Sequence, residues 1–524
     1  MKLFLLILTF LSANSIFAQT EYFQQKLSYT IDVKLNDQEK TVSGTATIQY
    51  TNASPDTLHF IWFHIWPNAY KNRNTALFKQ IDADDSRKSK EADATPGWIE
   101  GLDFTVNGVK ASTSTHDNPD YIDVIKLNLQ QPLLPGNSIT IATPFTVKLP
   151  HYFSRSGYDE TEFMVTQWYP KPAVYDKDGW HEFPYLDMGE YYSEYANYHV
   201  TISLPGDYIV GATGVMQNKK ELDAYKLIGA KNAKNRNGTP ELYKAQSAKN
   251  KTLSYKADNV VDFAWFADKN IVIQYDTIQL KSKVVDAFTF YHNKENTIWN
   301  NSIDYVKDAT RKYSEWIGEY EYPTVQAFEG PKNNASGGME YPMITLITQP
   351  DANPENLDAV ITHEVGHNWF MGMLGSNERK HTWQDEGLNT YYQFRYEADK
   401  YRSNSVAGEL PPQLKKMPAD KFQSAIYKFM TQIPMTTPID IPAADFKSSE
   451  DYGLTSYIKT AMWLYKLETI VGREGVDKAF QQYFNDWNGK HPTPKDMQNS
   501  FEKALARNLD DWFALLEKPE GIKY

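Results

Sequence analysis

The hydrophobic residues of this chain change their spacing near residue 275, and this change limits the possible folds more than any other feature. Before it, apolar and polar residues alternate in short runs separated by turn signals, which is the period of half-buried strands. The candidate strands are residues 41–51, 58–66, 138–149, 198–204, 208–212 and 260–266. The Lys-, Ala- and Asn-rich stretch 219–251 is expected to be a surface excursion from this β region.

After residue 275 the apolar residues take helical spacing. One candidate helix has Trp299, Ile303, Val306, Tyr313 and Ile317 on one face, and another has Ile458, Met462, Tyr465, Leu467 and Ile470 before Gly472. Thr493 and Pro494 are typical of the N-cap and first residue of a third helix. Two strands are expected at 324–328 and 343–348, and the Pro-rich stretch 411–442 is predicted to be an irregular insertion. The second half is therefore predicted to be α+β.

The composition excludes several classes of protein. With 524 residues, of which 41% are hydrophobic and 14% aromatic, the chain can bury a large core and is neither disordered nor fibrous. The net charge is −12 and there is no long basic block, so no nucleic acid partner is expected. The absence of cysteine excludes disulfides and thiolate chemistry, so any bound metal must use histidine and carboxylate ligands.

The first 18 residues have the pattern of a secretory signal peptide. A cationic Lys2 precedes an apolar run from Leu3 to Leu11, which is too short to span a bilayer, and small or polar residues lead to Ala18. We expect cleavage after Ala18 and a secreted or periplasmic mature protein with no transmembrane segment. Because an exported protein without disulfides is more typical of bacteria than of animals, a bacterial source is expected.

His363, Glu364 and His367 form an HExxH sequence. On a helix, positions i and i+4 share a face, so both imidazoles can reach one ion while Glu364 points beside it. Two surface histidines on an ordinary helix are the alternative. Glu386, nineteen residues after His367, can return as a third ligand after a turn and a second helix. Three protein ligands leave a fourth position for water, so we expect one catalytic Zn²⁺ per chain.

Two polar residues neighbour these ligands in the sequence. Asp385 precedes Glu386, and Asn368 follows His367. Metal-bound imidazoles usually donate their other N–H to a polar group, so either side chain is a candidate to orient a ring. A helix cap or an exposed polar residue is the alternative for each.

The HExxH sequence followed by eighteen residues and a glutamate resembles the gluzincin arrangement of zinc peptidases. Upstream, residues 337–341 (GGMEY) resemble the Gly-x-Met-Glu-Asn motif of the aminopeptidase N family, which includes the leukotriene hydrolase branch. Downstream, residues 457–461 (YIKTA) resemble the Tyr-x-Lys segment of that family. The three motifs occur in the family's order, and the resemblance extends from about Gln25 to the C-terminus.

The resemblance implies an organisation for the whole chain. An N-terminal all-β domain of sandwich or saddle shape, residues 19–272, would precede an α+β thermolysin-like zinc metallopeptidase domain, residues 273–524. Many family members continue into a large helical domain, whereas this chain ends soon after Trp512 and Phe513. We therefore expect either a minimal, more open enzyme or a truncated sequence.

The resemblance also implies roles for individual residues. Glu340 would bind the free α-amino group of a substrate, and Gly337 and Gly338 would let the substrate backbone approach closely. Tyr457 would donate a hydrogen bond to the oxyanion of the tetrahedral intermediate, with Tyr452 as its competitor. The alternatives are an ordinary edge-strand glutamate at position 340 and a core aromatic residue at position 457.

The sequence departs from the family pattern at several positions. Residues 166–169 (TQWY) resemble the segment through which the family's N-terminal domain also contacts the amine, so Gln167 is an amine-binding candidate. Tyr169, however, replaces the Gln or Glu that often follows two residues later, and Tyr341 replaces the final Asn of the exopeptidase motif. Residues 380–386 (KHTWQDE) differ from the Trp-rich stretch common in the family.

These features predict an exported zinc aminopeptidase that acts on peptides with a free N-terminus. A zinc-activated water would attack the peptide bond, and Glu364 would be the general base. The alternative enzyme is a thermolysin-like zinc metallo-endopeptidase, and the alternative outside enzymes is a non-catalytic homologue that binds peptides. The sequence does not fix the oligomeric state.

Overall fold

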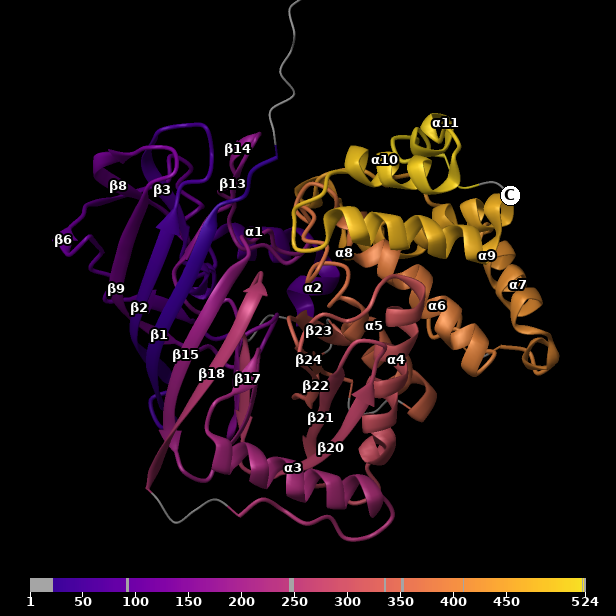
Figure 1. Cartoon of the computed structure of the whole chain (residues 1–524), viewed down its shortest axis with the longest axis horizontal. Helices are drawn as coiled ribbons and strands as arrows, with labels where there is room; N and C mark the ends of the chain where they lie inside the picture. The colour runs from indigo at the N-terminus through magenta and orange to yellow at the C-terminus, as the bar shows by residue number, and fades with distance from the viewer. Residues whose placement is uncertain are drawn as a thin grey trace, which may run out of the picture.

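The computed structural model of this chain describes residues 22–90, 94–244, 249–333, 336–349, 353–408, 410–520 and 522. The predicted signal peptide, residues 1–18, lies outside this part of the chain. Strands dominate up to about residue 270 and helices dominate after residue 350 (Figure 1). This order confirms the predicted fold class, a β-rich region followed by an α+β region. Among the described residues, no helix has the length and hydrophobicity that a membrane span requires.

A nine-stranded sheet is the largest element of the N-terminal region. Its path is β17 (Val215–Met216), β18 (Asn250–Val260), β15 (Ala196–Pro205), β1 (Lys26–Asn36), β2 (Thr41–Thr51), β9 (Ser138–Lys148), β5 (Thr105–Val106) and β6 (Val109–Lys110), and β4 (Trp98–Glu100) also pairs with β9. In β1, Leu27, Tyr29, Ile31 and every second residue up to Leu35 are buried. This alternation is the reason that the segment forms a strand with one face on the core.

Smaller sheets complete the N-terminal region. One contains β10 (Gly157–Asp159), β11 (Glu162–Val165), β19 (Trp265–Asp268) and β16 (Ile209–Ala212). A second contains β12 (Lys171–Pro172), β3 (Leu58–His64), β8 (Val124–Leu133) and β7 (Thr113–Thr115), and β13 (Tyr175–Asp176) pairs with β14 (Gly179–Trp180). The predicted strand 260–266 is wrong, because β18 ends at Val260 and β19 begins only at Trp265. The short helices α1 (Ala76–Ala83) and α2 (Asp85–Lys90) lie between β3 and β4 in the sequence.

The predicted surface excursion 219–251 is also wrong in part, because it contains the sixteen-residue helix α3 (Lys219–Lys234). Its buried residues are Tyr225, Gly229 and Asn232, which recur at helical spacing. The helix lies so close to β20 (Ile271–Gln279) that a methyl group on Gly229 would be 2.6 Å from Cβ of Tyr275. Because two of its three buried residues are glycine and asparagine, hydropathy alone does not reveal this helix.

The second half is built on a five-stranded sheet in the order β20, β21 (Val284–His292), β22 (Thr324–Glu329), β24 (Ile344–Ile347) and β23 (Gly338–Tyr341). The predicted strands 324–328 and 343–348 correspond to β22 and β24. The boundary predicted after residue 272 lies at the start of β20 and stays a prediction. The helices are α4 (Ser302–Trp316), α5 (Pro354–Gly366), α6 (Glu386–Lys400), α7 (Ala419–Met430), α8 (Ser449–Tyr452), α9 (Thr460–Trp487), α10 (Pro494–Leu505) and α11 (Asp510–Phe513).

Three predictions for the second half meet different outcomes. The helix predicted at Thr493 is confirmed, since Thr493 caps α10 and Pro494 is its first residue. The helix expected to end before Gly472 continues as α9, with Gly472 at a φ of +76° joining two helical parts across a kink. The Pro-rich stretch is not wholly irregular, because it contains α7, which buries Phe422, Ile426 and Met430 along one face.

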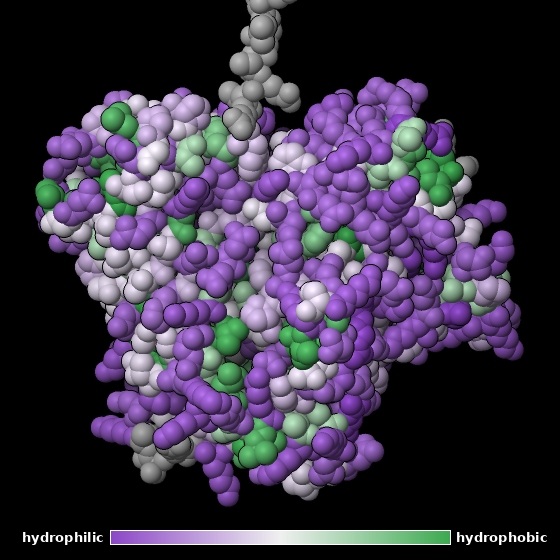
Figure 2. Space-filling model, in the orientation of Figure 1, coloured by the Kyte–Doolittle hydropathy of each residue, from purple (hydrophilic) through white to green (hydrophobic). Residues whose placement is uncertain are grey.

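The four-stranded sheet of the N-terminal region that contains β16 packs directly on the five-stranded sheet of the second half. At Gly211 in β16, a methyl group would lie 2.9 Å from the side chain of Ile344 and 3.1 Å from that of Phe328. The amide of Gln326 also donates to the carbonyl oxygen of Ala212 at 2.7 Å. The two halves therefore share one hydrophobic core. Outside it, the face shown in Figure 2 is mainly hydrophilic, with only small, separate apolar patches.

His292 lies at the edge of this contact, among carboxylates from both sheets. Its Nε2 is 2.7 Å from Glu162 of β11 and 4.0 Å from Asp268 of β19, and its Nδ1 is 3.4 Å from Glu329 of β22. Burial alone would lower the pKa of His292, but Glu162 and Glu329 outweigh burial and raise this pKa to about 9. A charged imidazolium therefore links the two sheets at neutral pH.

We expect the free energy of unfolding to fall as the pH rises from about 6.5 to 9. A histidine whose pKa is raised by folding stabilises fully below its unfolded pKa of about 6.5, and this contribution, up to about 3 kcal/mol, is lost as the pH passes the folded value. Urea unfolding at pH 6 and pH 9.5 should show the loss in the native chain and a much smaller one in His292→Gln.

The matched control is His59→Gln, since His59 is exposed on β3. It should unfold with the pH dependence of the native chain. Equal pH dependence in His292→Gln and the native chain would contradict the role assigned to His292.

Candidate metal centre

Three potential metal ligands meet where α5 ends and α6 begins. Asn353 caps α5, which Pro354 opens, and the helix places His363 in its last turn and His367 at its C-cap. The Nε2 atoms of these histidines are 3.1 Å apart. Glu386 is the first residue of α6, and its Oε2 lies 3.2 Å from Nε2 of His363 and 3.4 Å from Nε2 of His367.

This donor set fits Zn²⁺. Zinc bonds to histidine nitrogen and carboxylate oxygen at about 2.0–2.2 Å, so tetrahedral ligands lie roughly 3.3 Å from one another, close to the spacings in this site. Burial would raise the pKa of Glu386, but the charges and hydrogen bonds of His367 and His363 outweigh it and hold this pKa well below its usual value. Glu386 is therefore ionised, as a ligand must be.

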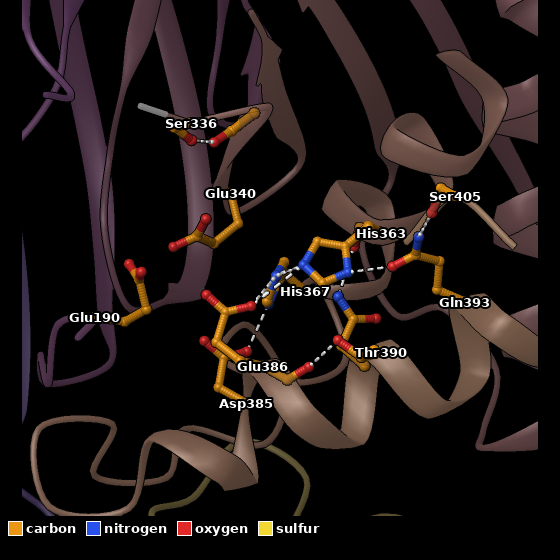
Figure 3. A network of polar contacts seen from close by, with 12 residues as sticks. Glu190, Ser336, Glu340, His363, His367, Asp385, Glu386, Thr390, Gln393 and Ser405 are labelled. Atoms are coloured by element: carbon orange, nitrogen blue, oxygen red, sulfur yellow. Dashed lines mark hydrogen bonds and ion pairs between the residues drawn. The ribbon is translucent and has the colours of Figure 1, made fainter. Parts of the chain in front are cut away.

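Side chains behind the two imidazoles orient them. Asp385 accepts a hydrogen bond from Nδ1 of His367 at 2.5 Å, and Gln393 accepts one from Nδ1 of His363 at 2.8 Å, which turns both Nε2 atoms toward Glu386 (Figure 3). Of the two predicted orienting residues, Asp385 therefore has the predicted contact. Asn368 does not, because its amide oxygen accepts from the backbone N–H of Met343 and the hydroxyl of Tyr320.

Gln393 was missed by the sequence prediction. It lies seven residues after Glu386, on the same face of α6, which is the signal that points to it. Its amide N–H₂ donates to Glu397 at 2.8 Å and to Ser405 at 3.0 Å, so its oxygen faces the imidazole.

A cavity of about 300 Å³ adjoins the ligands, and both glutamates of the predicted mechanism line it. One carboxylate oxygen of Glu364, one of Glu340 and one ring nitrogen of His367 lie within 4.8 Å of one another. Burial raises the pKa of Glu364 well above its usual value; His367 opposes this rise, and Glu340 and Glu386 add to it. Gly338 faces Glu364 so closely that a methyl group would lie 2.6 Å from its carboxylate oxygen, so Glu364 itself requires this glycine.

The segment that holds this site matches a known protein family. Residues 302–515 match the family model of the peptidase family M1 domain. This segment is an M1 peptidase domain. It contains the three zinc ligands together with Glu364, Glu340 and Tyr457.

Curated proteins similar to this chain include a leukotriene A-4 hydrolase homolog and leucine aminopeptidases. A leukotriene A-4 hydrolase homolog of Botryotinia fuckeliana is 25% identical over 224 residues, 40% of this chain and 34% of that protein. Leucine aminopeptidase 2 of Sclerotinia sclerotiorum is 27% identical over 224 residues, 40% of this chain and 36% of that protein. The matches thus span about a third of the length of these relatives.

Solved structures of M1 enzymes have the same fold over nearly the whole chain. The M1 zinc metallopeptidase from Deinococcus radiodurans aligns with a TM-score of 0.62 at 13% identity and covers 96% of both chains. Legionella pneumophila aminopeptidase A aligns with a TM-score of 0.62 at 15% identity, over 97% of this chain and 50% of its own. At these identities the likeness shows the fold alone.

The 300 Å³ cavity beside the metal ligands is called the zinc cavity below. Tyr457 reaches it from a π-helical segment, Gly453–Lys459. Its ring stacks on His363 with 5.9 Å between ring centroids, and it lines the 300 Å³ cavity. Its competitor Tyr452 lines an adjoining cavity of about 260 Å³, which also contacts Tyr457. π-Helical turns are often found at functional sites, where the wider turn redirects a side chain.

The N-terminal region contributes residues beyond the predicted Gln167. Gln167 is buried, accepts from Lys171 at 3.3 Å, and lines another cavity together with Glu340, so its amine-binding role stays a prediction. From this region, Glu190 and Arg155 line the 300 Å³ cavity beside the metal ligands. Neither residue lies in a motif, so the sequence offered no signal for them.

We expect Gln393→Met to weaken zinc binding by about 10- to 100-fold, because the imidazole of His363 loses the group that orients it. Competition with a chelator of known zinc affinity measures this. Gln423→Met is the control, since Gln423 is also buried but its amide oxygen accepts from Arg473. Equal zinc affinity in the two variants would contradict an orienting role for Gln393.

Proposed function

We propose that this protein is an exported zinc aminopeptidase that removes N-terminal residues from peptides with a free α-amino group. One observation carries the proposal: the carboxylate of Glu340 lies in the zinc cavity, within 4.8 Å of ligand atoms of Glu364 and His367. When Glu340 holds the α-ammonium of a substrate, the carbonyl of that same first residue lies beside Glu364 and the metal ligands. A carboxylate at this place attracts a free ammonium, which favours cleavage after the first residue.

The chemistry divides between the bound ion and the side chains of this chain. Zinc, when bound by His363, His367 and Glu386, supplies a Lewis acid that polarises the scissile carbonyl and lowers the pKa of a water from 15.7 toward about 7. Glu364 accepts the proton of the attacking water and passes it to the leaving amine. Its buried position supports this role, because a raised pKa allows the carboxyl group to retain that proton until the amine takes it.

Tyr457 stabilises the oxyanion that forms when the carbonyl is attacked. Burial raises the pKa of Tyr457 well above 10, and the charge of Glu386 raises it further, so the phenol stays protonated and can donate. Its stacking on His363 holds the hydroxyl beside the ligands. Donors of this kind typically account for about 3 kcal/mol of barrier lowering.

Two alternative functions differ in specific residues. An endopeptidase needs an open path on the N-terminal side of the scissile bond, whereas Glu340 and Glu190 place buried carboxylates there. A protein that only binds peptides has no need of a general base, whereas Glu364 is present and lies in the cavity.

The proposed function is tested with a leucyl-anilide and its N-acetylated form. We expect the native enzyme to hydrolyse only the free amine form, to lose activity with a zinc chelator, and to lose about 10²- to 10⁴-fold of kcat in Glu364→Gln, which lacks the proton acceptor. Zinc content should stay at one per chain in that variant.

Glu474→Gln is the control for this substitution, because Glu474 is exposed on α9. Equal hydrolysis of both anilides would replace the proposal with an endopeptidase. Bound zinc without any hydrolysis would replace it with a peptide-binding protein.

We also propose that residues 1–18 direct export, on the charge and hydropathy pattern of Lys2 and the run from Leu3 to Leu11. When the full chain is expressed in a Gram-negative bacterium, N-terminal sequencing of the periplasmic protein should begin at Gln19. Leu5→Arg with Leu8→Arg should leave an uncleaved protein in the cytoplasm, while Gln24→Arg should not. Cytoplasmic, uncleaved native protein would contradict export.

A further inference from the structure

A buried arginine lies between the two glutamates of the cavity. Nη1 of Arg155 donates to Oε1 of Glu340 at 3.0 Å, and its Nη2 donates to the carboxylate of Glu190. The side chains are almost fully enclosed, with exposed fractions of 14% for Arg155, 5% for Glu190 and 8% for Glu340. Figure 3 shows the two carboxylates next to each other, beside the zinc ligands.

Arg155 keeps Glu340 ionised against the effect of burial, because its charge, together with that of His367, outweighs burial and holds the pKa of this carboxyl below its usual value. Two neighbouring buried carboxylates cannot both ionise without a cation, because their repulsion and desolvation would force a proton onto one of them. A guanidinium is charged at every working pH, and its rigid fork can serve two carboxylates at once. At Glu190 burial outweighs Arg155 and holds the pKa of this carboxyl well above its usual value, so Glu340 is the carboxylate that meets the substrate ammonium.

The backbone around Arg155 is fixed from both halves of the protein. The hydroxyl of Thr166 donates to the carbonyl oxygen of Arg155 at 2.7 Å, and the amide of Asn333 donates to that of Ser154 at 2.9 Å. The guanidinium also lies over the ring of Tyr191, 5.2 Å from its centroid. Arg155 is therefore held in place, as a group that positions two other side chains must be.

Arg155 contacts one of the two carboxylate oxygens of Glu340. Arg155 bonds to Oε1, so Oε2 is the oxygen that can accept from a substrate amine. Glu190 lies beside Glu340 in the wall of the same cavity, where its carboxyl group can offer the amine a second oxygen acceptor. This arrangement gives the N-terminal region a carboxyl group at the amine although Tyr169 stands at the position where the family pattern has Gln or Glu.

We propose that Arg155 is a positioning residue of the amine subsite, which holds Glu190 and Glu340 side by side and anchors the Glu340 carboxylate where it meets the substrate ammonium. The proposal rests on the proposed aminopeptidase function and deepens it. Arg155 donates to the two glutamates and is not one of the three metal ligands, so we expect it to act on amine recognition rather than on the chemical step.

Two matched inhibitors isolate this effect. Leucine hydroxamate and 4-methylpentanoic hydroxamate bind zinc through the same group and differ only in the α-amino group. The ratio of their inhibition constants on the holoenzyme therefore measures amine recognition alone. We expect the native enzyme to bind the amine form at least tenfold more tightly, and Arg155→Met to lose most of that preference while its affinity for the amine-free form stays within about twofold.

A second substitution separates the pairing of Glu340 from the loss of its neighbour. Glu190→Gln keeps the size of the side chain and leaves Arg155 paired with Glu340, so we expect it to keep more of the preference for the amine than Arg155→Met does. Adding Arg155→Met to Glu190→Gln removes that pairing, so the preference should fall at least fivefold compared with Glu190→Gln. A double variant that keeps the preference of Glu190→Gln would overturn the proposal.

Arg155→Lys and Arg87→Met complete the test. Lysine keeps the charge but lacks the fork, so its preference should lie between those of the native enzyme and Arg155→Met. Arg87 forms a buried pair with Asp187 beside the neighbouring cavity, and Arg87→Met should keep the native preference.

The outcomes separate the two proposals. If the native enzyme does not prefer the amine form, the aminopeptidase function and this inference both fail. If it does, and Arg155→Met and Arg155→Lys keep the full preference, only the inference fails.

Discussion

The metal centre depends on how closely α5 and α6 approach each other. At Gly366 a methyl group would lie 2.0 Å from Oδ1 of Asn389, so only glycine permits this contact. Asn389 donates to the carbonyl oxygen of His363 at 2.7 Å and accepts from Tyr313 of α4 at 2.8 Å. These bonds fix the separation of the two helices, and the three ligands meet at one point only at that separation. The glycine inside the HExxH sequence is therefore as necessary as its histidines.

The cavity is shared between both halves of the chain. The catalytic half provides the ligands, Glu364 and Glu340, and the β-rich half provides Arg155 and Glu190. Their relative position is maintained by direct sheet-to-sheet packing at Gly211 and by one hydrophobic core that crosses the boundary. A cavity of this kind requires a rigid junction, because a shift of 1 Å between the halves would separate a guanidinium from its carboxylates.

Features with a local pattern could be predicted from the sequence, and features that depend on contacts between elements could not. Strand 41–51 alternates strictly, and His363 and His367 are one helical turn apart, so the period of a single element reveals each. α3 has a buried face with little hydropathy, because its role is a close approach to β20 at Gly229. Arg155 and Glu340 are 185 residues apart, and only the folded path of the chain brings them together.

The π-helical segment before α9 has a consequence for how this chain can change. A π turn accommodates an additional residue in a helix, so the residues on its two sides are out of phase compared with a regular helix. Point substitutions alter the side chains of such a segment but not its residue count. Tyr457 is thus directed toward His363 by a feature of chain length, and removing one residue between Gly453 and Tyr457 would turn it to another face while every motif letter stayed the same.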